Sequence, residues 1–517
     1  MSRITKIIAL GAALAALAVL VVPGREGSEA SAGGDSRPNV VVLQTDDQAL
    51  ADLAAMANTQ RLLVDRGTSF STHITPFSLC CPSRASMMTG AYPHNHGVIS
   101  NFPPDGGYGA FQDDEDRFIG AWLKESGYHT THIGKYLNGY GLWNNPHAAV
   151  PPGWSEWRGS ADPSTYQFWG YRLNEPDGSN VYGDFGVEDP QMYSTDVYAG
   201  KAVDVIRREA VRPGPFYLQV AFLAPHTERV PTVELTPEEL EDEESNITTI
   251  RPPRPAPRHQ GAFSDLPLPM DPSFNEADVS DKASIIQGLA SFDDAEVAEL
   301  EEDNQLRWET LLAVDEAVTS VVNALRRTGQ LSNTYIVFMG DNGYVLGQHR
   351  LSKGKYFPYE PALRIPLVVR GPGVRQGRTV STLVSIIDVA PTILDYAGVA
   401  PTGRTPDGIS LRGTLGGLVP PRRSIHLESG PQQGPNGEQL PLFSGVRTAR
   451  YAYWVYEGDV GEELYDLARD PYQLQSVHND PRYAATRTAL IAEAARLEAC
   501  SGAACQTQTP RIPAPTN

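Results

Sequence analysis

Several short apolar runs in this chain stop abruptly at polar residues, and this pattern constrains the fold more than any other feature. Runs of this length are typical of strands buried on both faces of a mostly parallel sheet. Ligands of such sheets bind beyond the carboxyl ends of the strands. We therefore expect a binding site where these runs end. The runs are Asn39 to Gln44 before Asp46-Asp47, Tyr128 to Ile133 before Lys135, Phe216 to Leu223 before His226, and Tyr335 to Met339 before Asp341-Asn342.

Helical patterns lie between these runs, for example Asp196 to Glu209 and Gln305 to Thr328, and the second ends beside Gly329, a typical helix stop. The alternation predicts an α/β fold with a large mixed, mostly parallel sheet sandwiched by helices. From Val230 to about Asp303 the chain carries an acidic run and a Pro-Arg stretch with little periodicity. We interpret residues 230–303 as an irregular excursion from the sheet rather than a domain.

The C-terminal region has a different pattern. After residue 418 the sequence turns to short alternating strands and a helix from Tyr483 to Leu497, which predicts a small antiparallel sheet packed with a terminal helix. We place a large domain, which would contain the expected binding site, at residues 36–418, a C-terminal subdomain at 419–500 and a tail at 501–517. Cys500 and Cys505 are spaced for a short-loop disulfide near the C-terminus.

The N-terminus has the layout of a secretory signal. Arg3 and Lys6 precede an apolar run from Ile7 to Val22, and Ala30-Ser31-Ala32 offers a cleavage site. We predict a signal peptide at residues 1–32, with a secreted or extracytoplasmic mature protein that has no stable membrane association. The alternative is an uncleaved segment that serves as a membrane anchor.

The net charge of −20 argues against nucleic acid as a partner, because such a surface repels phosphate. An anionic substrate would need a local cluster of positive charge to overcome this field. Individual Lys and Arg residues near the strand ends are therefore informative.

Two oxygen-donor pairs, Asp46-Asp47 and Asp341-Asn342, follow two different strands. Such hard ligands suit Ca²⁺ or Mg²⁺ rather than zinc. Either pair alone is more often a turn former or a helix cap, but both pairs at equivalent positions of one sheet favour a metal.

The stretch from Cys80 to Gly90, "CCPSRASMMTG", places two adjacent cysteines at the start of a predicted helix. Backbone N–H groups and the helix dipole favour an anion or an anionic nucleophile there. Arg84, one turn into the helix, has the planar fork that binds a tetrahedral anion. The alternative is that both cysteines are structural, either buried or bridged.

Cys80-Cys81-Pro82-Ser83-Arg84 followed by Thr89-Gly90 resembles the signature of formylglycine-dependent sulfatases, members of the alkaline phosphatase superfamily. The family's first strand and metal loop resemble residues 37–48, and its second metal segment resembles residues 340–373. "FLAPH" and "ELYDLARDPYQLQSV" match in the same order, so the resemblance covers nearly all of residues 37–480. It implies an alkaline phosphatase-like fold and hydrolysis of sulfate esters.

The resemblance also implies roles for individual residues. Cys80 becomes the nucleophile after a formylglycine-generating enzyme converts it to 3-oxoalanine (formylglycine), whose hydrate attacks sulfur. A divalent cation, usually Ca²⁺ with Mg²⁺ as the alternative, is held by Asp46, Asp47, Asp341, Asn342 and the modified Cys80. Arg84, Lys135, His226 and Lys355 surround the sulfate, and His226 or Lys355 acting with it protonates the leaving alcohol. Lys355 is preferred to Lys353 because it stands four residues before Tyr359-Glu360, as the family's lysine does.

One position departs from the family pattern. Many sulfatases have Lys-x-His after the strand that ends at Lys135, whereas this chain has Lys135-Tyr136-Leu137-Asn138. Asn138, His94 or His96 could occupy the space of that histidine, and His94 and His96 could equally serve packing.

"GKYLNGYG", the Cys-Cys form of the signature and "HNHGV" most resemble the N-acetylglucosamine-6-sulfatase branch, which suggests a sulfated amino sugar or glycosaminoglycan as substrate. The alternatives are a phosphonate or phosphate ester hydrolase of the same superfamily, and a non-catalytic carbohydrate-binding relative.

Overall fold

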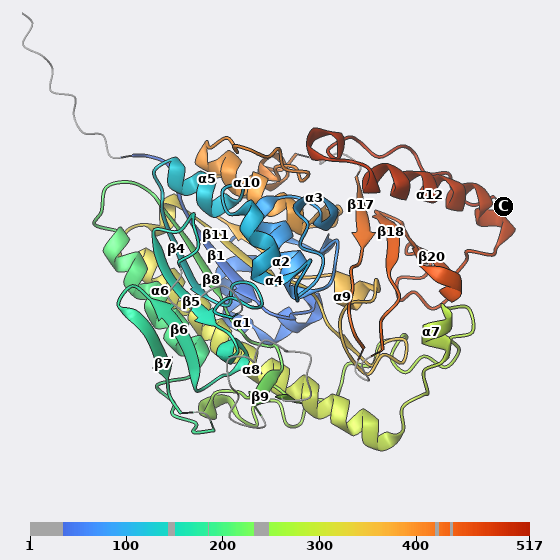
Figure 1. Ribbon diagram of the computed structural model, residues 1–517, viewed down its shortest axis with the longest axis horizontal. Helices are drawn as coiled ribbons and strands as arrows, with labels where there is room; N and C mark the ends of the chain where they lie inside the picture. Colours follow the sequence, from blue (N-terminus) through green and yellow to red (C-terminus); the bar gives the residue numbers. More distant parts are fainter. Residues whose placement is uncertain are drawn as a thin grey trace, which may run out of the picture.

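A ten-stranded mixed sheet forms the centre of the computed structural model (Figure 1). The structure describes residues 35–516 except 143–149, 185, 232–247, 419–422 and 435–437, and only the backbone of 230, 231, 248 and 249. In spatial order the strands are β15 (Arg378–Val380), β2 (Thr68–Phe70), β14 (Leu367–Arg370), β11 (Thr334–Gly340), β1 (Asn39–Thr45), β8 (Phe216–Ala221), β4 (His129–Gly134), β5 (Glu156–Ala161), β6 (Tyr171–Glu175) and β7 (Gly178–Tyr182).

The five central strands, β11, β1, β8, β4 and β5, run parallel to one another. The four strands expected from the apolar runs are all in this group, and the predicted fold class is confirmed. Because these strands are parallel, the residues that follow their carboxyl ends meet at one edge of the sheet.

Helices cover both faces of the sheet (Figure 1). Successive side chains of a strand point to opposite faces, so Val40 and Val42 pack in one apolar core and Val41 and Leu43 in another. The first core includes α2 (Cys80–Thr89), α5 (Ile119–Glu125) and α10 (Val389–Ala397), and the second includes α6 (Ser194–Glu209) and α8 (Asp294–Arg327). A one-residue shift of β1 would exchange the two sets of side chains, so packing fixes the register of the strand.

Helix α8 begins at Asp294, so the last ten residues of the segment predicted to be irregular, 294–303, are helical. The side chain of Asp293 accepts hydrogen bonds from the N–H groups of Ala295 and Glu296, and Glu296 accepts one in return from the N–H of Asp293. This capping box starts the helix within a run that looked acidic and irregular.

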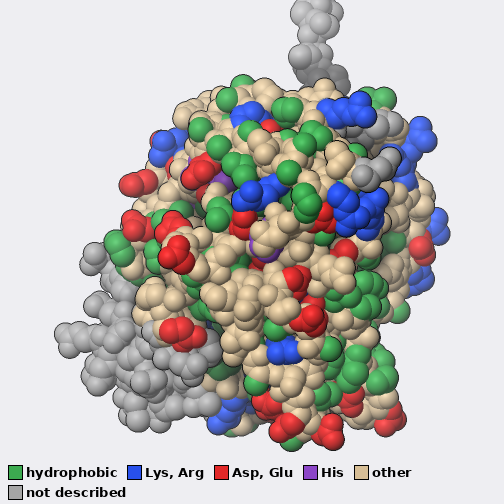
Figure 2. Space-filling view, turned by 90° about the vertical axis from the view of Figure 1, so that its right-hand side faces the viewer, with side chains coloured by type: hydrophobic (Ala, Val, Ile, Leu, Met, Phe, Trp, Pro, Cys, Tyr) green, Lys and Arg blue, Asp and Glu red, His purple; other side chains and the backbone are tan. Residues whose placement is uncertain are grey.

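A four-stranded antiparallel sheet packed with α12 (Ala484–Glu498) forms the C-terminal region, as expected from the sequence. Its strands are β17 (Ser424–Glu428), β18 (Phe443–Thr448), β19 (Tyr451–Tyr456) and β20 (Glu462–Asp466). The predicted disulfide between Cys500 and Cys505 is present. Figure 2 shows the side of the molecule that carries this region, where acidic and basic side chains are interspersed with apolar ones.

The remaining α-helices and β-strands are short. They are α1 (Ala57–Thr59), β3 (His73–Ile74), α3 (Pro93–His96), α4 (Gly107–Phe111), β9 (Glu228–Pro231), β10 (Thr248–Arg251), α7 (Ser284–Gln287), β12 (Val345–Leu346), β13 (Lys353–Gly354), α9 (Glu360–Leu363), β16 (Val384–Ser385) and α11 (Arg412–Leu415).

Three expectations stay predictions. The signal peptide lies outside the described residues, as does the segment just after the boundary placed at residue 418. The division into a catalytic domain, subdomain and tail is likewise untested. Within the described ranges, no helix combines the length and apolar character that a bilayer crossing requires.

Candidate active site

The two oxygen-donor pairs meet at the carboxyl edge of the central sheet. Thr45 at the end of β1 pairs with Gly340 at the end of β11, so the residues that follow are brought side by side. The N–H of Asp47 donates to Asp341 Oδ1 at 3.0 Å, and Asn342 Nδ2 donates to Asp47 Oδ1 at 2.6 Å. All four side chains are almost completely buried. The sequence prediction that these pairs converge is confirmed, while their role as metal ligands stays a prediction.

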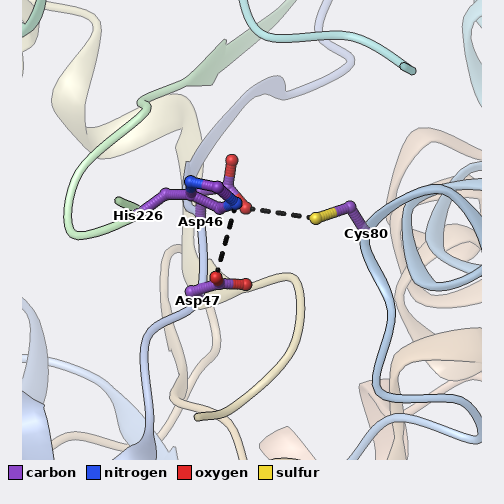
Figure 3. A group of neighbouring side chains, drawn as sticks. All are labelled: Asp46, Asp47, Cys80 and His226. Carbon is purple, nitrogen blue, oxygen red and sulfur yellow. Dashed lines mark hydrogen bonds and ion pairs between the residues drawn. The ribbon is translucent and has the colours of Figure 1, made fainter. Parts of the chain in front are cut away.

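Cys80 is the first residue of α2, with the extended Leu79 before it. Pro82 is accommodated in the first turn, where its missing N–H has no intrahelical partner to lose. The helix ends at Gly90, whose φ of 70° favours glycine. Figure 3 shows the Cys80 side chain pointing from α2 toward the sheet edge, with Sγ 3.6 Å from Asp46 Oδ1.

Two lysines contact the Cys80 sulfur. Lys135, directly after β4, has its Nζ 3.4 Å from Sγ and also donates to Asp46 Oδ2. Lys355 has its Nζ 2.8 Å from Sγ and also donates to Asp47 Oδ1. Lys353, by contrast, forms ion pairs with Glu299 and Asp303.

Arg84 and His226 complete the cluster. Arg84 reaches back from α2, so that its Nε donates to Asp341 Oδ2 at 2.9 Å and its Nη2 is 3.6 Å from Asp46 Oδ2. His226 follows β8, and its Nε2 is 3.5 Å from Asp47 Oδ2 (Figure 3). Every residue that the sequence assigned to the site is therefore in one cluster.

Burial and mutual charge shift the pKa values of this cluster in opposite directions. Burial would raise the pKa of Asp46, but the positive charges around it together outweigh burial, so the pKa falls well below its usual range. These charges are Lys135, His226, Arg84 and Lys355. Burial and the neighbouring Asp46 charge raise the pKa of Asp341 to about 6. Burial raises the pKa of Cys80 to about 11 and lowers that of His226 to about 4. Such opposed shifts in one small volume are typical of functional sites.

The donor set fits a hard divalent cation. Asp46, Asp47, Cys80 and His226 each offer a ligand atom, and these atoms lie within 4.8 Å of one another. Oδ1 of Asn342 is buried, and no hydrogen-bond partner for it is found among the described residues. Three carboxylates and an orphaned amide oxygen match the ligands that Ca²⁺ and Mg²⁺ prefer.

A cleft of about 660 Å³ opens over Cys80. Its walls include His226, Lys355 and Tyr166, together with apolar residues from the excursion, such as Ile285 and Phe292. This volume is within the range of small-ligand sites.

None of the three residues considered for the missing histidine lines this cleft. Leu137, two residues after Lys135 where the family has histidine, packs in the apolar core. Asn138 faces Cys81, whose Sγ is 3.2 Å from its Oδ1. The ring of His94 contacts Glu428, and that of His96 contacts Ser86 Oγ at 3.0 Å.

Cys81 is buried in the apolar core, consistent with a packing role, and accepts a hydrogen bond from the N–H of Asn138. Sequence reasoning did not identify Tyr166, because it lies outside every family motif and only the fold brings it to the cleft.

Comparison with known proteins identifies the family. Residues 38–399 match the Sulfatase family model, and residues 347–499 match "N-sulphoglucosamine sulphohydrolase, C-terminal". An arylsulfatase of Volvox carteri is 32% identical over 92% of this chain and 76% of its own length. The N-acetylglucosamine-6-sulfatase of Homo sapiens is 32% identical over 95% of this chain and 90% of its own.

Solved structures share the fold. One, described as a complex with its substrate D-glucosamine-2-N,6-O-disulfate, has a TM-score of 0.69 at 22% identity and covers 89% of this chain and 97% of its own. The phosphonate monoester hydrolase of Agrobacterium radiobacter has a TM-score of 0.62 at 23% identity over 90% of this chain and 96% of its own. Together with the site geometry, the sequence matches show that the chain belongs to the sulfatase family and is a sulfuric ester hydrolase.

Proposed function

We propose that this protein hydrolyses a sulfate ester on an amino sugar, either free or within a glycosaminoglycan. The human relative named N-acetylglucosamine-6-sulfatase aligns over nearly the whole chain at 32% identity. A relative in Bacteroides thetaiotaomicron named N-acetylglucosamine-6-O-sulfatase aligns over 88% of the chain at 25% identity. Relatives named for this sugar thus align with the catalytic and the C-terminal regions alike, which supports an amino-sugar substrate.

The observation that carries the proposal is the position of Cys80 between two ammonium groups. Its Sγ is 3.4 Å from Lys135 Nζ and 2.8 Å from Lys355 Nζ, at the start of α2 and at the cleft wall. A sulfate ester is an anion whose departing oxygen gains further negative charge as the S–O bond breaks. Fixed positive groups around position 80 would stabilise that charge, which is usually the largest catalytic contribution.

We assign a divalent cation, Ca²⁺ with Mg²⁺ as the alternative, to Asp46, Asp47, Asp341 and Asn342, with position 80 in contact. The cation would supply positive charge to the sulfate group, and formylglycine at position 80 would supply a hydrated aldehyde as the oxygen nucleophile. The orphaned Oδ1 of Asn342 supports the cation. The placement of Cys80 against Asp46 supports position 80 as the point of attack.

The remaining polar side chains would bind and orient the ester. Lys135 and Arg84 would neutralise sulfate oxygens from the side of the sheet. His226, or Lys355 acting with it, would transfer a proton to the leaving alcohol. Arg84, Lys135 and His226 are buried, and the side chain of Lys355 is only 14% exposed, which strengthens each electrostatic interaction.

We also propose that the protein is exported and that Cys80 is modified during its synthesis. Cleavage after Ala32 would yield a secreted or extracytoplasmic protein, and the disulfide between Cys500 and Cys505 is suited to an oxidising compartment. A formylglycine-generating enzyme would act on Cys80 before the chain folds, because α2 buries this residue in the folded protein.

The test is hydrolysis of N-acetylglucosamine 6-sulfate, an aryl sulfate and an aryl phosphate by the purified, matured protein. We expect sulfate release from the sugar at a kcat/KM above that for the aryl sulfate, and a far lower rate with the phosphate. The Cys80→Ala variant should be folded and inactive toward all three. A large preference for the phosphate ester would contradict the proposal.

A further inference from the structure

Tyr166 is a cleft residue to which neither the family motifs nor the proposed mechanism assigns a role. It ends a short 3₁₀ turn, Ser164–Tyr166, that follows β5. Because β5 is parallel to β4, this turn lies at the same sheet edge as Lys135. The side chain lines the cleft together with Cys80 and Lys355.

Three groups of the site hold the ring of Tyr166. Lys135 Nζ is 4.5 Å from the ring centroid, and the guanidinium carbon of Arg229 is 4.6 Å from it. The imidazole of His226 lies 4.7 Å away, centroid to centroid. Cations over an aromatic face are attracted to it, and the interaction is stronger where water is excluded. The ring is therefore fixed in place before any substrate arrives.

The hydroxyl of Tyr166, by contrast, is buried and has no hydrogen-bond partner among the described residues. Leaving a buried hydroxyl unpaired is costly, because the hydrogen bonds that it makes to water in the unfolded chain are lost and not replaced. Buried polar groups are almost always paired, so an unpaired one needs an explanation. At the wall of a cleft that takes an anionic ester, a substrate oxygen is the natural acceptor.

The residues considered as replacements for the family's histidine contact other parts of the protein. The position of the family's histidine is taken by Leu137, which packs in the apolar core. Asn138 is turned to Cys81, and His94 to Glu428. Tyr166, whose hydroxyl is unpaired among the described residues, is a neutral donor beside Lys135.

We infer that the Tyr166 hydroxyl donates a hydrogen bond to an oxygen of the substrate's sulfate group, and that Tyr166 is a substrate-binding residue of this enzyme. The inference rests on the proposed function, since it takes position 80 as the place where the sulfate group binds. The donor is neutral and preorganised, so it adds to the affinity for the anion without adding to the charge of the cluster.

The test uses two tyrosine-to-phenylalanine variants. Tyr171 provides the matched control: its hydroxyl is also buried and unpaired among the described residues, but its ring packs against Tyr182 and Tyr198 and does not line the cleft. Each substitution removes one hydroxyl and keeps the ring. Loss of a general packing contribution would therefore affect both variants alike.

Binding is measured by calorimetry in the Cys80→Ala background, where no turnover occurs, with 4-nitrophenyl sulfate as the probe. Tyr166→Phe should weaken binding about 10-fold or more, as expected for a hydrogen bond to a charged group. Tyr171→Phe should leave it unchanged, and both variants should unfold near the temperature of the parent. Equal affinity of Tyr166→Phe and its parent would overturn the inference, and so would an equal loss in both variants.

A kinetic comparison separates this inference from the proposed function. In the matured enzyme with Cys80 intact, Tyr166→Phe should lower kcat/KM for sulfate esters about 10-fold or more. If the parent hydrolyses sulfate esters and Tyr166→Phe does so equally well, the inference alone fails. If the matured parent hydrolyses no sulfate ester, the proposed function fails, and the inference fails with it.

Discussion

The two ends of helix α2 serve different purposes. At its start, Cys80 faces a cluster in which three carboxylates, Lys135 and Arg84 are buried together and Lys355 is mostly buried. Asn342 Oδ1 and the Tyr166 hydroxyl remain unpaired among the described residues. Burying so many charges is costly for stability, so this end is organised for ligands rather than for the fold.

The C-terminal end of α2 is instead organised for contacts within the fold. Beyond Gly90, α3 presents polar side chains to the C-terminal region, and they find partners there. His94 Nδ1 lies 3.1 Å from both carboxylate oxygens of Glu428, and Asn95 Nδ2 donates to the carbonyl oxygen of Cys500 at 2.9 Å. The two ends therefore differ in whether other groups of the protein pair with their polar side chains: at the C-terminal end they do, and at the start of the helix some stay unpaired among the described residues.

Metal removal should have the largest effect on the ligand-binding end. Thorough chelation should abolish turnover of an aryl sulfate, because the positive charge of the divalent cation beside the carboxylates is then lost. Activity should return on addition of Ca²⁺, and titration of Mg²⁺ in parallel identifies the better ion. Unchanged activity in protein shown by elemental analysis to be metal-free would contradict the assignment of Asp46, Asp47, Asp341 and Asn342.

The two lysines near the cleft should differ sharply. Lys355→Ala removes an ammonium in contact with position 80, and kcat/KM should fall about 100-fold or more, as for loss of one transition-state donor. Lys353 also lines the cleft, but its ammonium is paired with Glu299 and Asp303 and does not contact position 80, so Lys353→Ala should stay within about threefold of the parent. Steady-state kinetics on the same preparations compare the two. Similar losses of kcat/KM in both variants would contradict the choice of Lys355 as the lysine that acts at position 80.

At the C-terminal end of α2, Glu428→Gln should lower stability rather than activity. The substitution weakens the contact between α3 and β17, so we expect a loss of about 1 kcal/mol in the free energy of unfolding, with kcat unchanged. Denaturant titration and kinetics on one sample measure both quantities. A fall in kcat without a loss of stability would mean that the two ends are not separate.

The stability loss in Glu428→Gln should also depend on pH. Burial would lower the pKa of His94, but the hydrogen bond to Glu428, the charge of that carboxylate and smaller contributions from Cys500 and Asp407 together outweigh burial and raise the pKa above the ordinary 6.5. A raised pKa gives stability that is fully present below pH 6.5 and is lost as the pH rises through the folded-state pKa. The difference between parent and variant should therefore be larger near pH 5.5 than near pH 8.5, by about 0.5–1 kcal/mol. A difference that grows with pH would contradict this sign.

Much of the ligand-binding end could be predicted from the sequence, because its residues directly follow buried strands or start a helix with a recognisable motif. Asp46, Lys135, His226 and Asp341 are of this kind. Tyr166 could not be predicted, since its position depends on how the turn after β5 packs against side chains from three other segments. The contacts of His94 and Asn138 also depend on tertiary packing, which has no local sequence pattern.

The fold, too, could be predicted where it follows local sequence patterns and not elsewhere. Period and length of the apolar runs predict the central strands and the helices between them. The start of α8 was missed because a capping box, rather than apolar periodicity, determines where that helix begins.

Mass spectrometry of the peptide that spans Cys80 and Cys81 would show whether position 80 carries the reactive group. In active protein from a host with a formylglycine-generating enzyme, we expect residue 80 as the aldehyde and residue 81 as an intact thiol. The fraction converted should follow the specific activity across preparations. An unmodified Cys80 thiol in fully active protein would contradict the account.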